Sequence, residues 1–269
     1  MSTPAFDYVL LKKFELVLPA FTREPIRAFW RRMRGNPEIR IARHLCDPHR
    51  VALDIGASMG DFSEALADRA KGCVAFEANP NTSAMLAKRL RKSNLQVHAC
   101  ALSDREAEVK LLFPVVNHVD FLSLATVEPD NNMSGHETKS ITVPCRTLDS
   151  FDLPPVGFIK IDVEGHEIAV LKGARSLIER DQPNFLIEVE ERHKPGAVKA
   201  VSSFFMQLGY QGFFLLGRRL HPLTEFDQAL HQASSSISLS KVLPGRVYAN
   251  NFVFVTDVKS LNGLLGRSL

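Results

Sequence analysis

The sequence predicts an α/β fold built on a mostly parallel β-sheet, with a helical extension in front of it. From Val51 onward, short apolar runs alternate with helical stretches, which is typical of βαβ units. The chain has 269 residues, of which 45% are hydrophobic and 23% are charged. These values suit one sizeable globular domain with additions. No run of about 18 apolar residues occurs, so the sequence predicts no membrane-spanning helix.

Residues 1–48 are expected to form an N-terminal helical cap, and residues 49–269 the main domain. Residues 5–46 have the pattern of amphipathic helices, broken near three prolines. Residues 1–50 contain ten Lys and Arg against five Asp and Glu, whereas the remainder has a net charge of −2. We expect this basic segment to be a solvated helical face. Contact with a membrane surface is the alternative, and nucleic-acid binding is not expected.

Seven apolar runs are predicted as the strands of the main sheet, each short enough for a strand. Five of them alternate with helical stretches, which indicates parallel pairing, and the last two are expected to close the sheet. The runs are VALDI (51–55), CVAFE (73–77), LQVHACAL (95–102), GFIKID (157–162), NFLIEVE (184–190), GFFLL (212–216) and NFVFV (251–255).

The helices between these strands are predicted from their 3.6-residue periodicity. Residues 107–147 interrupt the alternation, with two further strand-like runs (EVKLLF and SITVPCRTL) around a polar stretch, EPDNNMSGHETK, that looks like a loop. Residues 217–247 are expected to be a loop or irregular insert. The predicted helices are 61–70, 82–92, 167–180 and 196–208.

The cysteines and the N-terminal residues predict the cellular compartment of the protein. The four cysteines stand far apart and form no CxxC pair, so we expect reduced thiols and no zinc site. Charged residues interrupt the apolar patch near the N-terminus, which argues against a signal peptide. The expected location is the cytoplasm.

The ends of the first two strands predict a nucleoside site, because ligands of open α/β sheets bind beyond the carboxyl ends of the strands. The first strand ends in DIGASMG, whose glycines allow a tight turn and close approach of a ligand. Asp54 could accept hydrogen bonds from a cationic ammonium group. Glu77 follows Gly56 by 21 residues, a spacing at which a carboxylate can accept both ribose hydroxyls.

The same turn argues against a dinucleotide. NAD sites carry GxGxxG, where backbone amides approach a pyrophosphate, but here the pattern is DxGxxxG. Asp61, near the start of the next helix, would repel a pyrophosphate. A phosphate-free ligand fits better, and S-adenosylmethionine, with its adenosine and amino-acid parts, is such a ligand.

Six segments together make the sequence resemble the FkbM family of methyltransferases, from about Val51 to Glu190. The resemblance implies a Rossmann-like class I methyltransferase fold, with a seven-stranded, mostly parallel sheet. It also implies O-methylation of a hydroxyl group on a carbohydrate or a secondary metabolite. The segments are DIGASMG (54–60), AFEANP (75–80), ALSD (101–104), VPCRTLDSF (143–151), IKIDVEGHEIAVLKGA (159–174) and FLIEVE (185–190).

The resemblance also implies which residues surround S-adenosylmethionine. Glu77 would hold the ribose, and Asp162 would lie next to the reactive methyl group. Asp54, Gly56, Ala57 and Gly60 would line the methionine and ribose part. Ala78, Asn79, Ser103 and Asp104 would approach the adenine.

Three residues of DVEGHE are candidates for the reacting groups. Methyl transfer to a hydroxyl needs close alignment of oxygen and methyl, and a base that takes the hydroxyl proton helps further. Asp162 ends a strand at the ligand edge, and His166 could reach the same mouth. Glu164 is the third candidate. The alternatives are a solvated histidine at a helix start, a loop-organising Glu164, and a helix-dipole role for Glu167.

A metal-assisted variant is also open. Asp162 and Glu188 would end neighbouring strands, and carboxylates are the oxygen ligands that Mg²⁺ prefers. A bound Mg²⁺ could lower the pKa of an acceptor hydroxyl. The expected partner is a small-molecule or glycan acceptor. Two other functions stay open: a catalytically silent cofactor-binding module, and a nucleic-acid methyltransferase that uses the basic N-terminal segment.

Overall fold

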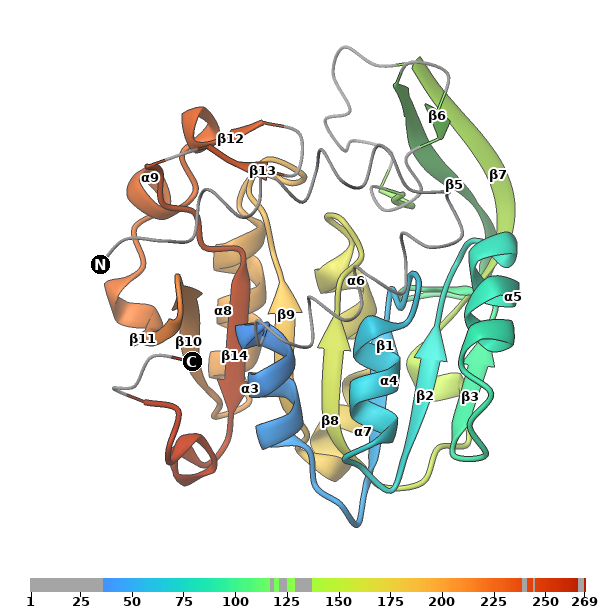
Figure 1. The fold of residues 1–269 in the computed structure, drawn as a ribbon, viewed down its shortest axis with the longest axis horizontal. Helices are drawn as coiled ribbons and strands as arrows, with labels where there is room; N and C mark the ends of the chain where they lie inside the picture. The colour runs from blue at the N-terminus through green and yellow to red at the C-terminus, as the bar shows by residue number, and fades with distance from the viewer. Residues whose placement is uncertain are drawn as a thin grey trace, which may run out of the picture.

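The protein folds around one large mixed β-sheet (Figure 1). The computed structural model describes residues 36–116, 119–120, 125–128, 137–238, 241–243, 245–265 and 269. The sheet has eight strands in the order β11-β10-β14-β9-β8-β1-β2-β3. Their bounds, in that order, are Arg219–Pro222, Gln211–Leu216, Asn251–Val255, Asn184–Glu188, Val156–Ile161, Val51–Ile55, Gly72–Phe76 and Leu95–His98.

The direction of the strands confirms the predicted βαβ organisation. Strands β3, β2, β1, β8 and β9 pair in parallel, and β14, β10 and β11 add antiparallel pairs at one edge. The order β3-β2-β1-β8-β9 has the chain reversal beside β1 that characterises doubly wound folds. Every residue of β1, β2, β8 and β14 is buried, because helices cover both faces of the sheet.

Two hydrophobic clusters fill the two sides of the sheet. Helices α3 (Pro37–Leu45) and α4 (Asp61–Ala67) contribute to one, together with η5 (Val258–Leu261). Three other helices build the larger cluster, in which Phe205 stacks on Phe254 and meets Phe185 edge-on. These are α6 (Glu167–Lys172), α7 (Arg175–Asp181) and α8 (Ala197–Gln207).

Asn-Pro pairs begin two of the helices. The side chain of Asn36 accepts hydrogen bonds at the start of α3, and that of Asn79 does so at the start of α5 (Pro80–Arg89). The proline that follows each asparagine occupies the first helical turn, where its missing N–H has no cost. This cap explains why α5 begins two residues before the predicted residue 82.

The prediction of seven strands is wrong by one, because the predicted insert 217–247 begins with strand β11. Gly217 takes a φ of +61° in the tight turn after β10, which lets the chain fold back on itself. Leu220 of β11 then joins the hydrophobic cluster beside α3 and α4. The rest of the insert forms short elements: η3 (Leu223–Glu225), α9 (Gln228–His231), η4 (Ser234–Ser236), β12 (Ile237–Ser238) and β13 (Lys241–Val242).

The third predicted strand, residues 95–102, is divided between two sheets. Its first half is β3, but β4 (Ala101–Leu102) pairs with β7 (Glu137–Arg146) in a second sheet. This sheet has the order β4-β7-β5-β6 and confirms the two strands predicted within residues 107–147. Strands β5 (Ala107–Val116) and β7 form its long antiparallel hairpin, and β6 (Val119–Asp120) extends it. Residues 129–136 of the polar stretch lie outside the described residues.

The single helix predicted over 167–180 is two helices. The chain bends at Gly173, where a Cβ atom would lie 1.9 Å from the carbonyl oxygen of Ser103. The backbone of Ser103 therefore needs a glycine opposite it, and this glycine is the C-cap of α6. The short 3₁₀ helix η2 (Leu148–Ser150) packs near the start of α7, where Asp149 accepts hydrogen bonds from two backbone N–H groups.

The N-terminal extension is only partly described. Helix α3 lies in it and packs against the main sheet, with Ile41 and Leu45 buried. Residues 1–35, where the other cap helices are predicted, lie outside the described residues, so the cap at 1–48 stays a prediction. None of the helices in the described part is long and apolar enough to cross a membrane.

Candidate active site

A cavity of about 200 Å³ opens where β1, β2 and β8 end, below the second sheet. Figure 1 shows the β5–β7 hairpin rising at this end of the molecule. Much of the cavity lining is apolar and includes Phe76 and Leu102. Among the described residues, its charged lining consists of Glu77, Asp162 and Glu164, without any Lys or Arg. Such a cavity repels phosphate groups and attracts a cation.

The turn after β1 forms the floor of this cavity. Gly56 has a φ of +80°, and its backbone N–H and that of Ala57 donate to the carbonyl oxygen of Phe76. A Cβ atom on Gly56 would lie 1.8 Å from the carbonyl oxygen of Asp162. Gly60, with a φ of +84°, begins α4 and is packed against Leu86. The predicted glycine turn thus brings the ends of β1 and β8 into contact.

Glu77 lines the cavity and fixes the loops beside it. Its two carboxylate oxygens accept hydrogen bonds from the backbone N–H groups of Ser58 and Asn79, each at 2.8 Å. Burial raises the pKa of Glu77, although these two hydrogen bonds lower it. A carboxylate has about four lone-pair positions, so two remain for ligand hydroxyls. This arrangement fits the ribose-binding role that the sequence predicts.

Asp54 lies beneath the glycine turn and does not line the cavity. It is 2% exposed, and its carboxylate accepts a hydrogen bond of 2.5 Å from the Ser63 hydroxyl of α4. Burial raises the pKa of Asp54 to about 6. The side chain of Asn79 is likewise committed to the cap of α5. The other predicted cofactor residues outside the cavity lining are Ala57, Gly60, Ser103 and Asp104.

His166 borders the cavity and is held from two sides. Its Nε2 lies 2.9 Å from the Ser103 hydroxyl, and its Nδ1 lies 3.2 Å from Glu128 Oε2. Lys194 Nζ contacts the same Glu128 oxygen at 3.0 Å. Burial lowers the pKa of His166, although Glu128 raises it. With 12% of its side chain exposed, His166 is not the solvated helix-start histidine of the alternative interpretation.

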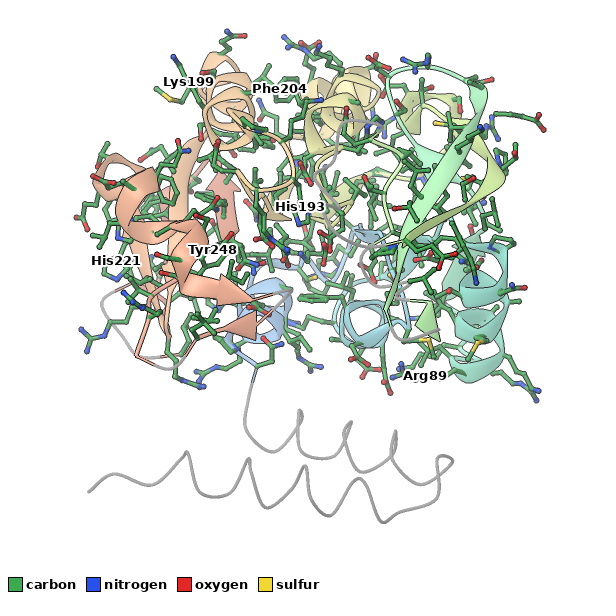
Figure 2. The ribbon with its side chains drawn as sticks, turned by 90° about the horizontal axis from the view of Figure 1, so that it is seen from above. Arg89, His193, Lys199, Phe204, His221 and Tyr248 are labelled. Carbon is green, nitrogen blue, oxygen red and sulfur yellow. The ribbon has the colours of Figure 1, made fainter. Side chains whose placement is uncertain are left out.

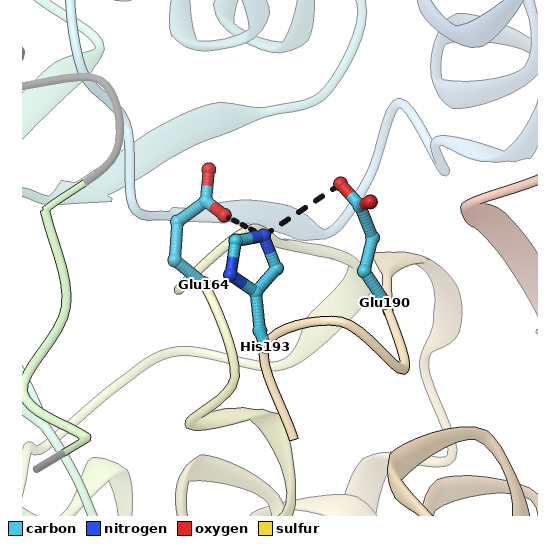
Figure 3. Close-up of side chains that lie close together, drawn as sticks. All are labelled: Glu164, Glu190 and His193. Carbon is cyan, nitrogen blue, oxygen red and sulfur yellow. Dashed lines mark ion pairs between the residues drawn. The ribbon is translucent and has the colours of Figure 1, made fainter. Parts of the chain in front are cut away.

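Glu164 lines the cavity and also contacts a second group of charges (Figure 3). Its Oε2 lies 2.6 Å from Nε2 of His193, which lies 3.8 Å from Oε1 of Glu190. Burial lowers the pKa of His193, but hydrogen bonds to the two glutamates raise it to about 9. Arg192 holds Glu190 by two hydrogen bonds of 2.6 and 2.9 Å. Sequence reasoning did not find His193 or Arg192.

Asp162 and Glu188, the predicted Mg²⁺ ligands, share a buried cation of the protein itself. Lys160 is 1% exposed, and its Nζ lies 3.7 Å from Oδ2 of Asp162. Burial lowers the pKa of Lys160, but Asp162 and Glu188 raise it more. Glu188 also accepts a hydrogen bond of 2.6 Å from Asn250. The Lys160 ammonium therefore supplies the positive charge that a Mg²⁺ ion would otherwise bring to this pair.

Glu167 gives a prediction about stability and pH. It is 1% exposed, and its Oε1 accepts a hydrogen bond from the backbone N–H of Gly165 at 2.7 Å. Burial raises its pKa from 4.5 to about 7. Glu167 thus ionises at a lower pH in the unfolded chain than in the folded protein. The stability that this difference gives is fully present below pH 4.5 and is lost as pH rises to about 7. The loss is about 3 kcal/mol.

The free energy of unfolding of the wild type should decrease between pH 5 and about 7, and we expect Glu167→Gln to make this decrease smaller. The glutamine keeps an oxygen for the Gly165 N–H but carries no charge. Urea unfolding at several pH values measures this. A variant curve parallel to that of the wild type would show that Glu167 is not the group responsible. Glu179→Gln, on the exposed side of α7, is the matched control.

Comparison with known proteins shows to which family this chain belongs. The family model described as Methyltransferase FkbM domain matches residues 54–212. A search of curated proteins gave no match. The similar solved structures include a methyltransferase FkbM from Methylobacillus flagellatus KT, 18% identical, with a TM-score of 0.48. That match covers 77% of this chain and 44% of the other, so this chain spans less than half of that protein.

Two further structures are similar at lower identity. A precorrin-6y C5,15-methyltransferase from Geobacter metallireducens is 13% identical over 81% of this chain and 84% of that one, with a TM-score of 0.40. An rRNA methylase from Streptococcus thermophilus is 11% identical over 81% and 92%, with a TM-score of 0.44. The family model covers more than half of the chain and includes the turn after β1, Glu77 and Asp162. The chain belongs to the FkbM family of S-adenosylmethionine-dependent methyltransferases.

Proposed function

We propose that this protein transfers the methyl group of S-adenosylmethionine to a hydroxyl oxygen of a carbohydrate or a secondary metabolite. The observation that carries the proposal is the charge of the cavity. In the part of the chain that the structure describes, three carboxylates and no Lys or Arg line it, which suits a sulfonium cation without phosphate. Acidic side chains also accept hydrogen bonds from the several hydroxyls of a sugar.

Each part of the cavity has a role in binding the methyl donor. Glu77 accepts the ribose hydroxyls, and the apolar walls at Phe76 and Leu102 cover the adenine. Gly56 lets the backbone pass under the ligand without a side chain in the way. When bound, S-adenosylmethionine supplies an electrophilic methyl group on a positively charged sulfur. Asp162, at the end of β8, places a negative charge at the same mouth.

Asp162 is the group that we assign to the acceptor's proton. Its side chain is 34% exposed, whereas Glu164 is 12% exposed and held by His193. His166 has both ring nitrogens engaged, by Ser103 and Glu128. His166 therefore positions the acceptor by contact and does not take its proton. Glu164 lines the cavity and binds His193. The neighbouring Lys160 keeps Asp162 oriented toward the mouth.

The test is a screen of acceptors with labelled S-adenosylmethionine across glycans and hydroxylated metabolites, with label transfer as the readout. Calorimetry should detect binding of S-adenosylmethionine and not of NAD. Absence of donor binding would contradict the proposal. If label reaches RNA in preference to any hydroxylated small molecule, and RNA binding weakens steeply with salt, the nucleic-acid alternative replaces it. Donor binding without transfer to any acceptor would favour the silent module.

Replacing Asp162 gives a direct prediction about turnover. Asp162→Asn should lower turnover by roughly 10²–10⁴-fold, the typical contribution of a general base. Donor affinity should fall much less than turnover, because the asparagine keeps the shape of the side chain and two of the three carboxylates, Glu77 and Glu164, remain. Steady-state kinetics with the identified acceptor and calorimetry with the donor separate the two effects. Unchanged turnover would show that another group takes the proton.

The proposal also includes a cellular compartment, a membrane contact and a test for Mg²⁺. All four cysteines are buried free thiols, which supports placement in the reducing cytoplasm. Peripheral membrane contact through the basic N-terminal segment is compatible with a glycan acceptor carried on a lipid. Turnover that survives EDTA would show that Asp162 and Glu188 need no Mg²⁺.

A further inference from the structure

Three side chains on two loops come together beside the cofactor cavity (Figure 3). Glu164 follows β8, and Glu190 and His193 follow β9. One carboxylate oxygen from each glutamate and one nitrogen of the imidazole all lie within 4.8 Å of one another. The exposed fractions of the three side chains are 12%, 2% and 9%. Three ligand-type atoms thus lie close together and are largely shielded from solvent.

The sequence places two of these side chains in one turn of backbone. The backbone N–H of His193 donates to the carbonyl oxygen of Glu190 at 3.1 Å, so the Glu-x-x-His segment closes on itself. Glu-x-x-His in one turn directs a carboxylate and an imidazole to the same ion in di-iron and di-manganese carboxylate proteins. Here a turn outside a helix places a carboxylate and an imidazole side by side.

A glycine brings the second loop close enough to complete the group. Gly165 has a φ of +99°, and a Cβ atom on it would lie 3.1 Å from Cβ of His193. The absence of a side chain there lets the Glu164 loop pack directly on the His193 turn. Glu164 itself takes a φ of +52°, an unusual conformation for a glutamate. The close approach therefore sets the separation between Glu164 and His193.

Neighbouring groups orient Glu190. Arg192 donates to both of its oxygens, Tyr248 donates to Oε2, and Asn250 donates to Oε1 at 3.5 Å. Oε1 accepts from Arg192 at 2.9 Å and from Asn250 only at 3.5 Å, so an ion at Oε1 would take the place of the long contact with Asn250. Hydrogen bonds of this kind fix first-shell ligands in metal sites. Figure 2 shows His193 near the middle of the view from above, with Tyr248 to its left.

We infer that Glu164, Glu190 and His193 bind one divalent transition-metal ion beside the cofactor cavity. An imidazole with two carboxylates favours Zn²⁺, Mn²⁺ or Fe²⁺ over Mg²⁺ and Ca²⁺, which prefer oxygen ligands alone. Three protein ligands leave a coordination position open, as in catalytic metal sites. This site is distinct from the Asp162 and Glu188 pair, where Lys160 is the cation.

The ion has a role that rests on the proposed function. Because Glu164 also lines the cavity, an ion bound to it would lie beside the donor site. Its open position would take the acceptor hydroxyl and lower the pKa of that hydroxyl. Binding of the ion does not depend on this role, so it can be tested without donor or acceptor.

The experiment is equilibrium dialysis of the full chain, stripped with chelator and then titrated with Zn²⁺ and, separately, Mg²⁺. We expect one Zn²⁺ per chain and much weaker binding of Mg²⁺. His193→Ala and Glu164→Gln should each lower Zn²⁺ affinity by at least about 100-fold. Tyr248→Phe, which removes one hydrogen bond to Glu190, should lower it by roughly 10-fold.

The matched control is His221→Ala. His221 also pairs with a glutamate, Glu225, at 3.4 Å, but it lies on edge strand β11 with no third ligand among the described residues. Its replacement should leave Zn²⁺ affinity unchanged. X-ray absorption of the Zn²⁺-loaded wild type should show a histidine nitrogen at about 2.0–2.1 Å, and this needs no variant.

Two outcomes overturn the inference. One is the absence of stoichiometric Zn²⁺ binding to the wild type. The other is binding that His193→Ala leaves unchanged while the variant remains folded by thermal unfolding. In both cases the triad is an ion-pair network in which the protonated imidazole itself is the cation. Zn²⁺ binding without methyl transfer would contradict the proposed function alone, and methyl transfer without Zn²⁺ binding would contradict this inference alone.

Discussion

Replacing Glu77 with alanine is expected to weaken binding of S-adenosylmethionine by about 100-fold. Hydrogen bonds to a charged group contribute about 1.5–3 kcal/mol each, and the ribose offers two hydroxyls. Even the lower value gives about 3 kcal/mol for the pair, which corresponds to roughly 100-fold in affinity. The variant also frees the backbone N–H groups of Ser58 and Asn79 that Glu77 now binds. The turn under the ligand should loosen as a result.

Calorimetry with the wild type, Glu77→Ala and Glu77→Gln measures this effect. The glutamine variant should fall between the other two, because its amide oxygen still accepts a hydrogen bond but carries no charge. Glu179→Ala, an exposed carboxylate change on α7, is the control. If Glu77→Ala binds the donor within about threefold of the wild type, well under the 1.4 kcal/mol that tenfold represents, Glu77 does not hold the ribose.

The parts of the site that the sequence predicts are those that depend on local spacing. Gly56 and Glu77 each follow a strand of the parallel sheet, and parallel neighbours bring their carboxyl ends together. The pattern of short apolar runs therefore places both residues at one edge without any knowledge of long-range contacts. The same reasoning places Asp162, which follows the strand on the other side of β1.

The surroundings of His166 could not be predicted, because they depend on the path of the chain between distant segments. Ser103 is 63 residues away in sequence, and Glu128 is 38 residues away. Ser103 reaches His166 because it follows β4, which pairs with β7 in the second sheet. Glu128 follows the bridge between Thr126 and Leu112 of β5. Apolar periodicity showed one run over residues 95–102 and contained no signal for that change of sheet.

His193 was missed for a different reason. It lies in a turn after β9, outside any strand or helix, where neither periodicity nor a familiar motif marks it. The Glu-x-x-His spacing from Glu190 is a signal in the sequence, but a short pattern of this kind is common. It gains meaning only when Gly165 brings Glu164 against the same turn. Strand β11 was missed likewise, because a four-residue run gives too little periodicity to assign.

The glycine at position 56 supports the second large prediction. Gly56→Ala should lower the free energy of unfolding by about 3 kcal/mol or more and weaken donor binding with it. A positive φ alone costs a non-glycine residue about 1–2 kcal/mol. Here the added Cβ would also lie 1.8 Å from the carbonyl oxygen of Asp162, and crowding of that kind costs typically 1–3 kcal/mol. Relief of the clash requires β1 and β8 to separate where the donor binds.

Gly196→Ala separates these two costs. Gly196 has a φ of +83°, close to the +80° of Gly56, but nothing lies within 4 Å of where its Cβ would stand. Urea unfolding should therefore show a loss of about 1–2 kcal/mol for Gly196→Ala and a clearly larger loss for Gly56→Ala. Calorimetry should show reduced donor affinity only for Gly56→Ala. Equal losses of stability would mean that the backbone at Asp162 moves away from the added Cβ atom at little cost in free energy. Because Asp162 is also the residue assigned to the acceptor's proton, the site would then have to tolerate movement of that group.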